Sequence, residues 1–165
     1  MRTYSSLIIL FLFFGTLQNT YAEAWGKTGH RVIGVIAQKY LTPKATKQVN
    51  TLLGGMSLAF VSTYADEIRS DDRYDHLAPW HYVNIDQNTR YSEAEKNPKG
   101  DIVTAIQSCI EVLKTPTSSQ EDKTFHLKLL VHFIGDIHQP FHTGRKEDRG
   151  GNSIDLFWFG KLTNL

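Results

Sequence analysis

Cysteine and an excess of charge are both nearly absent from this 165-residue chain, and each absence excludes a class of function. Cys109 is the only cysteine, so the chain makes no internal disulfide and carries no paired-cysteine motif for metal or redox chemistry. The 18 basic and 17 acidic residues leave a formal net charge of +1. No overall field therefore draws the protein to nucleic acid or anionic lipid, and any polyanion must be bound at a local site.

Long hydrophobic runs are lacking as well, with one exception close to the N-terminus. Arg2 precedes the apolar run Leu7–Phe14, and Ala22-Glu23-Ala24 has the A-x-A pattern of a cleavage site. An uncleaved membrane anchor is the alternative, but the run is too short to span a bilayer. The sequence therefore predicts a signal peptide over residues 1–24 and a periplasmic or extracellular protein that begins at Trp25 and has no membrane anchor.

Apolar residues recur at helical spacing through most of residues 25–165, and neither a repeat nor a second domain interrupts them. Thr42-Pro43, Ser57 and Ser119 have the pattern of N-caps, and Gly54-Gly55 that of a helix end. The predicted class is mainly α, with helices over residues 30–41, 43–53, 57–70, 101–114 and 119–139. Cys109 falls on an apolar stripe, which indicates an inert core thiol.

The segments between these helices are predicted to be irregular or extended. Residues 70–79 and 87–100 are expected to be polar loops. Residues 80–86 are expected to be extended, and residues 150–160 to form a short strand or hairpin.

The stretch VHFIGDIHQPFH, residues 131–142, concentrates the groups that can do chemistry. His132 and Asp136 are four residues apart, so on a helix they share a face and can bind one metal centre. His142 follows Pro140 and can turn back toward that face, whereas His138 is about 240° around the helix from His132. The alternative is a half-buried helix with polar residues on its solvent side.

Three more candidates come from other segments, each with a structural alternative. Asp66 lies among apolar residues, where a carboxylate needs a partner, or it pairs with Arg69 on the surface. His81 is a metal ligand or a hydrogen-bonded core histidine, and His30 a ligand or a solvent-facing residue. Zinc binds histidine nitrogen and carboxylate oxygen, and a bridging carboxylate such as Asp136 can hold two ions about 3.5–4 Å apart.

These segments together resemble the S1/P1 nucleases, which are secreted zinc-dependent nucleases and 3′-nucleotidases. The resemblance covers residues 25–165 through the segments WGKTGH, ADEIR, HYVNID, VHFIGDIHQPFH and GGN. It implies a phospholipase C/P1 nuclease-like helical domain with three zinc ions at the base of a cleft.

The resemblance also assigns ligands to the first zinc ion. These are the α-amino nitrogen and carbonyl oxygen of Trp25, with His30 and Asp136. Because that amine is freed only by cleavage after Ala24, export would complete the site.

The second ion is implied to bind four side chains, Asp66, His81, His132 and the shared Asp136. The third is implied to bind His142 together with a histidine and an aspartate that the family places beyond Leu165. The sequence is therefore expected to be incomplete at its C-terminus, with two zinc sites complete and the third represented by His142.

Four residues are implied to act in catalysis or in substrate binding. Asp66 and Arg69 belong to the catalytic ADE-x-R segment, in which the arginine steadies the phosphate. Tyr82 falls where the family has an aromatic residue that stacks on a nucleobase. Asn84 stands where fungal members have an aspartate that reads the base edge.

The implied activity is zinc-dependent hydrolysis of single-stranded DNA or RNA and of 3′-nucleotides, giving 5′-phosphate and 3′-hydroxyl products. No stable protein partner is implied. A zinc phospholipase C is one alternative, although its spacing from the N-terminal tryptophan to the first histidine is longer. An inactive zinc-binding fragment is the other, because ligands of the third ion are missing, and we expect weak or no activity from this chain.

Overall fold

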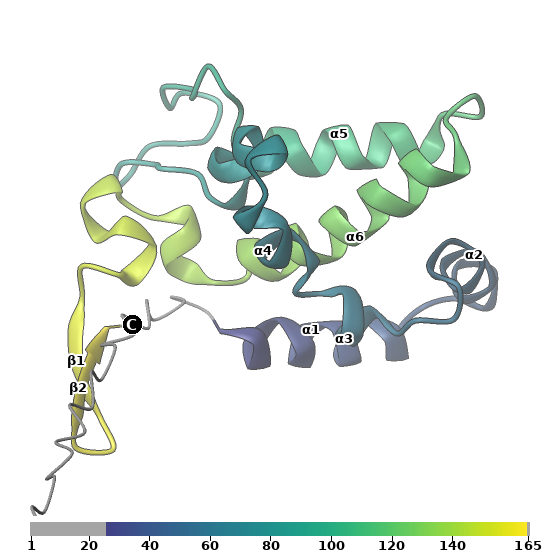
Figure 1. Ribbon diagram of the computed structural model, residues 1–165. Helices are drawn as coiled ribbons and strands as arrows, with labels where there is room; N and C mark the ends of the chain where they lie inside the picture. Colours follow the sequence, from purple (N-terminus) through teal and green to yellow (C-terminus); the bar gives the residue numbers. More distant parts are fainter. Residues whose placement is uncertain (1–25, 165) are drawn as a thin grey trace, which may run out of the picture.

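The computed structural model describes residues 26–164 and confirms a mainly α fold (Figure 1). The α-helices are α1 (Lys27–Lys39), α2 (Pro43–Leu53), α3 (Leu58–Val61), α4 (Tyr64–Glu67), α5 (Ile102–Lys114) and α6 (Gln120–Ile137). Short 3₁₀ helices and one hairpin complete the fold: η1 (Ile68–Ser70), η2 (Asp72–His81), η3 (Pro140–Thr143), η4 (Lys146–Gly151), β1 (Asp155–Trp158) and β2 (Lys161–Asn164). The predicted signal peptide and Trp25 lie outside the described residues. Within residues 26–164, no helix has the length and apolar character needed to cross a bilayer.

Several helix ends follow the predicted capping residues. Thr42 accepts a hydrogen bond from the Ala45 amide, with Pro43 in the first turn, and α2 ends at Gly54 with a left-handed φ of 59°. Ser119 caps α6 by accepting from the Asp122 amide. The local sequence therefore determines where these helices begin and end.

Helix α6 contributes to both hydrophobic cores of the described chain. Leu129 and Phe133 pack with α5 and η2, whereas Leu127 packs with α2 and α3. Figure 1 shows α5 and α6 running side by side. Cys109 on α5 is fully buried, and burial raises the pKa of its thiol to about 12, so the prediction of an inert core cysteine is confirmed.

Helix α1 packs closely on α3 because Gly34 has no side chain. A Cβ at Gly34 would lie 2.7 Å from the Cα and amide nitrogen of Ala59, closer than real contacts allow. Gly34 and His30 are the two buried residues of α1, so this close approach accompanies the burial of His30 against the rest of the fold.

The predicted continuous helix over residues 57–70 is wrong, because it breaks at Ser62 and Thr63 into α3, α4 and η1. Ser57 does cap α3, accepting from the Phe60 amide. The Ser62 hydroxyl then donates to the Ala59 carbonyl, and the Thr63 hydroxyl donates to Glu67. Such short polar side chains bond to neighbouring groups in place of the regular helical pattern, which accounts for the break.

The predicted polar loop over residues 70–79 is also wrong, as is the extended backbone at residues 80 and 81. Residues 72–81 form η2, capped by Asp71. Tyr74, Leu77 and Trp80 follow the three-residue period of a 3₁₀ helix and pack on the core through one face. A search for periods of 3.6 and 2 misses that pattern.

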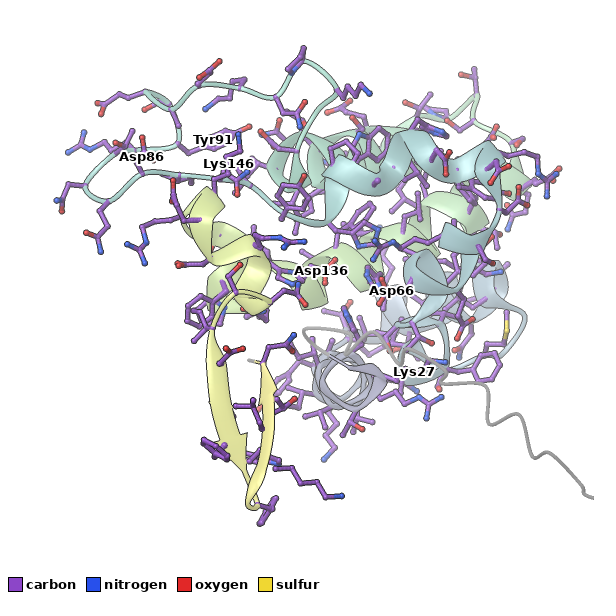
Figure 2. The ribbon with its side chains drawn as sticks, turned by 60° about the vertical axis from the view of Figure 1, so that its left-hand side comes forward. Lys27, Asp66, Asp86, Tyr91, Asp136 and Lys146 are labelled. Carbon is purple, nitrogen blue, oxygen red and sulfur yellow. The ribbon has the colours of Figure 1, made fainter. Side chains whose placement is uncertain are left out.

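The strand or hairpin predicted over residues 150–160 is confirmed in part: the hairpin spans residues 155–164, and residues 150 and 151 belong to η4. Strands β1 and β2 pair antiparallel, with Trp158 opposite Lys161. Phe159 and Gly160 form the two-residue loop, both with positive φ. The hairpin projects away from the helices (Figures 1 and 2). Its aromatic residues are largely exposed.

Candidate metal centre

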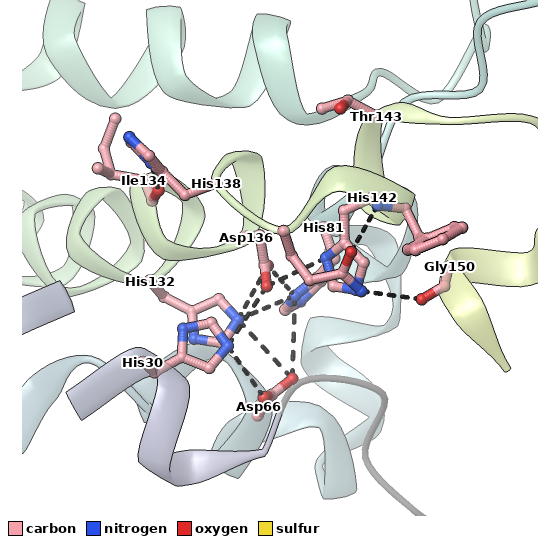
Figure 3. Close-up of polar contacts among 12 residues, drawn as sticks. His30, Asp66, His81, His132, Ile134, Asp136, His138, His142, Thr143 and Gly150 are labelled. Carbon is pink, nitrogen blue, oxygen red and sulfur yellow. Dashed lines mark hydrogen bonds and ion pairs between the residues drawn. The ribbon is translucent and has the colours of Figure 1, made fainter. Parts of the chain in front are cut away.

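The six side chains predicted to bind metal converge at one place between the helices (Figure 3). They come from five separate elements: His30 from α1, Asp66 from α4, His81 from η2, His132 and Asp136 from α6, and His142 from η3. Figure 2 shows the two carboxylates, Asp66 and Asp136, near each other at the meeting point of the helices. The fold therefore assembles groups that are up to 112 residues apart in the sequence, from residue 30 to residue 142.

Asp136 lies at the centre of this cluster and uses both carboxylate oxygens. Its Oδ2 is 3.0 Å from His81 Nδ1 and 3.0 Å from His132 Nε2. Its Oδ1 is 3.3 Å from His30 Nε2 and 3.3 Å from His142 Nδ1. Asp136 thus faces imidazoles in two directions, as a bridging ligand must.

Asp66 closes the more open side of the cluster. Its Oδ1 is 3.8 Å from His132 Nε2 and 3.9 Å from His81 Nδ1, and its Oδ2 is 4.0 Å from His30 Nε2. Arg69 Nη1 lies 3.6 Å from Asp66 Oδ1, with a side chain that is 61% exposed. Asp66 therefore takes part in both of the predicted alternatives, the buried cluster and the arginine pair.

The break between α3 and α4 orients His132. The Ser62 carbonyl accepts a 2.7 Å hydrogen bond from His132 Nδ1. With the proton on Nδ1, the lone pair of Nε2 points at Asp66, Asp136 and His81, which is the tautomer a metal ligand needs. Sequence reasoning missed Ser62 because it acts through its backbone oxygen, although two adjacent hydroxyl residues inside a predicted helix were a usable signal.

The cluster's electrostatics favour a bound cation. Burial alone would raise the pKa of Asp136, but the surrounding imidazoles hold it well below its usual range. Burial alone would lower the pKa of His132, but its bond to Asp136, the charge of Asp66 and the Ser62 carbonyl raise it. A buried carboxylate needs compensating positive charge, which protons on the imidazoles or a metal ion can supply.

The donor atoms fit a metal ion in kind and in spacing. His30, Asp66 and His132 form one group, and His81, His132 and Asp136 another, each with donor atoms within 4.8 Å of one another. Two ligands on one tetrahedral zinc ion lie about 3.4 Å apart, given bonds of about 2.0–2.2 Å. Contacts of 3.0–4.0 Å among these six side chains span that value. The arrangement could therefore hold metal at two adjacent positions.

His138 is outside the cluster, as its angle around α6 predicted. Its ring is exposed, and Nδ1 lies 2.7 Å from the Ile134 carbonyl, facing away from Asp136 (Figure 3). His142 does turn back past Pro140, and its Nδ1, 3.3 Å from Asp136 Oδ1, places it in the same cluster as the other five side chains.

The two predicted substrate-binding residues lie on an extended segment beside this centre. Residues 81–84 alternate between buried and exposed positions, so Tyr82 and Asn84 share the solvent side while His81 faces inward. Val83 donates its amide proton to the His142 carbonyl at 2.8 Å, which joins this segment to η3. The segment thus presents an exposed aromatic ring and an amide on its solvent side, opposite to His81.

The sequence comparisons identify the family to which this arrangement belongs. The S1/P1 nuclease family model matches residues 25–165, and the chain belongs to that family. The chain is 37% identical to Endonuclease 2 of Arabidopsis thaliana over 157 residues, covering 87% of this chain and 53% of that protein. It is 34% identical to Nuclease S1 of Aspergillus oryzae, covering 90% of this chain and 53% of that protein. For Nuclease P1 of Penicillium citrinum the identity is 30%, over 86% of this chain and 55% of that protein.

The chain spans about half the length of these curated relatives. Residues 25–165, the part that the family model matches, contain all six clustered side chains.

Proposed function

We propose that this chain carries the metal-binding part of a zinc-dependent nuclease. Its substrates are single-stranded DNA or RNA and 3′-nucleotides, and its products have 5′-phosphate and 3′-hydroxyl ends. The observation that supports this most strongly is the convergence of four imidazoles on the buried carboxylate of Asp136, in a chain of the S1/P1 nuclease family.

The proposed zinc ligands are those that the family resemblance implies. His30 and Asp136 serve one ion, with the Trp25 amine and carbonyl, and Asp66, His81, His132 and Asp136 serve a second. Bound zinc supplies an attacking water of lowered pKa and positive charge beside the phosphoryl oxygens. His142 serves a third ion, whose other ligands are not among the described residues.

The remaining roles belong to side chains on the open side of the cluster. Arg69 is exposed and 3.6 Å from Asp66, so its guanidinium can donate to phosphoryl oxygens held next to that carboxylate. Tyr82, which is 39% exposed, can stack on a nucleobase, and Asn84 on the same side can contact the base edge. Stacking requires an unpaired base, which favours a single-stranded substrate.

Export and the metal site are linked in this proposal. A signal peptide over residues 1–24 is removed after Ala24, and the new amine at Trp25 has an ordinary pKa of about 8, low enough for zinc to displace its proton. Mass spectrometry of the exported protein should find Trp25 as the first residue. An active, zinc-loaded protein that starts at another residue would refute this part of the proposal.

The activity is tested with a 5′-labelled single-stranded oligonucleotide and with phosphatidylcholine vesicles. We expect slow, chelator-sensitive cleavage of the oligonucleotide and no release of phosphocholine. Arg69→Ala should lower the rate by about 10²–10³ with unchanged zinc content, because it removes one donor to the developing charge. Phosphocholine release without DNA cleavage would identify a phospholipase C. Zinc binding without any hydrolysis would identify an inactive zinc-binding protein.

A further inference from the structure

Gln139 is a buried polar side chain close to the metal centre. It lies two residues beyond the end of α6 and is 4% exposed. Its Nε2 donates to the Gly150 carbonyl at 3.0 Å, and its Oε1 accepts from the Phe141 amide. Because one partner is an acceptor and the other a donor, only this orientation of the amide satisfies both.

His142 contacts both Gln139 and Gly150, the two residues that the first of these hydrogen bonds joins. The His142 amide donates to the Gln139 carbonyl at 3.0 Å, and the His142 carbonyl accepts from Val83 at 2.8 Å. On the other side, a Cβ built on Gly150 would lie 3.4 Å from His142 Cδ2 and 3.6 Å from its Nε2. The backbone of Gly150 therefore packs against the imidazole of His142. The hydrogen bond from Gln139 connects this backbone to the residues that follow α6.

The loop that contains Gly150 has an unusual backbone conformation. Arg149, Gly150 and Gly151 have φ of 49°, 69° and 98°, all in the left-handed region that a side chain disfavours. Asn152 Nδ2 donates to the Arg149 carbonyl at 2.9 Å, and Gln139 donates to the next carbonyl along the chain. A left-handed backbone of this kind persists when surrounding contacts fix it. Gln139 supplies one such contact, from the segment that follows α6.

We propose that Gln139 is a positioning residue for His142. It fixes the loop at Gly150 and the turn at Phe141, and it thereby keeps the imidazole against the centre, with Nδ1 3.3 Å from Asp136 Oδ1. Groups that orient metal ligands commonly contribute 10–100-fold to metal affinity. This inference rests on the proposed function, because it takes His142 to be a zinc ligand.

The first variant is Gln139→Met, which keeps the length of the side chain and removes both hydrogen bonds. The second is Gln139→Glu, which keeps an acceptor for the Phe141 amide but sets a carboxylate oxygen against the Gly150 carbonyl. We expect both to weaken binding of the most weakly held zinc ion by about 10–100-fold in competition with a chromophoric chelator. Circular dichroism and the unfolding transition check that each variant is folded.

A double-mutant cycle with His142→Ala separates positioning from a general effect on the fold. If Gln139 acts through His142, then Gln139→Met should change zinc affinity by less than about twofold once His142 is absent. The visible spectrum of the Co²⁺-substituted Gln139→Met protein should shift in the direction of the His142→Ala spectrum.

Thr124→Val is the matched control. Thr124 also ties α6 to a distant backbone carbonyl, that of Leu52 at 3.0 Å, but it lies near the other end of the helix. It should lower stability and leave zinc affinity unchanged.

The possible outcomes test the role of Gln139 separately from the nuclease proposal. Unchanged affinity in Gln139→Met, or equal losses in both backgrounds of the cycle, would overturn the role of Gln139 and leave the nuclease proposal standing. Unchanged zinc binding in His142→Ala would instead remove His142 from the ligand set, and both its metal role and the inference would fall.

Discussion

The metal centre buries polar side chains, whereas the C-terminal hairpin exposes apolar ones. His132 is 0% exposed and Asp136 1%, whereas Phe157 is 74% exposed and Phe159 89%. Burying ionisable groups is unfavourable unless they are paired, and exposed aromatic rings add little to stability. We therefore expect substitutions at the centre to have large effects on metal binding, and substitutions in the hairpin to have small effects on stability.

The largest effect is expected from Asp136→Asn. This change removes the anionic charge and one bridging oxygen from the point where four imidazoles meet. Zinc affinity should fall by more than about 100-fold, beyond the usual effect of an orienting residue. Chelator competition on the purified protein measures this.

The matched control is His138→Ala at the residue that follows α6, which removes an exposed imidazole outside the cluster. It should leave zinc affinity within about twofold of the parent protein. Equal losses in the two variants would mean that the cluster is not the zinc site.

The second expected effect is a rise in zinc affinity with pH. The pKa of His132 is raised, so its ring keeps a proton at higher pH than an ordinary imidazole, whose pKa is about 6.5. Zinc must displace that proton, whereas Asp136, with its depressed pKa, remains anionic throughout.

Affinity should therefore increase by about tenfold per pH unit while the His132 proton must be displaced, and level off above the raised pKa of His132. Dissociation constants measured from pH 6 to pH 9 in non-coordinating buffers test the slope. A flat profile would show that the imidazoles do not compete with protons for the metal.

Part of the fold and of the candidate site could be predicted from the sequence. His132 and Asp136 were predictable because an i, i+4 pair on a helix has a known geometry. The placement of His30, Asp66 and His81 followed from the segments that resemble the family, since spacing alone left each with a structural alternative. The helix caps followed from local chemistry at Thr42, Ser119 and similar residues.

The features that were missed depend on contacts between distant segments. Ser62 orients His132 through a carbonyl 70 residues away, and the adjacent hydroxyl residues Ser62 and Thr63 signal the helix break but not this contact. Gln139 closes on Gly150 through a loop whose left-handed residues were not anticipated. The three-residue period of Tyr74, Leu77 and Trp80 was visible but belongs to a helix type that rarely runs long.

The smallest expected effect is at the tip of the hairpin. Phe159 has a φ of 47° in a two-residue loop with Gly160 at 76°, a pairing for which asparagine or aspartate before glycine is preferred. Phe159→Asn should raise the free energy of unfolding by about 0.5–1 kcal/mol, by relieving the unfavourable backbone of a bulky residue. Zinc affinity should be unchanged, because the substitution is outside the cluster of metal ligands.

Chemical denaturation of the two proteins, each with saturating zinc, measures that difference. The ring lost in this variant contacts Trp158 edge-on at a centroid distance of 5.1 Å, a pair that contributes about 0.5–1.5 kcal/mol when well packed. A decrease in stability would mean that this aromatic pair outweighs the backbone strain. The exposed hairpin would then contribute to stability as the buried parts do, and the contrast with the metal centre would rest on metal binding alone.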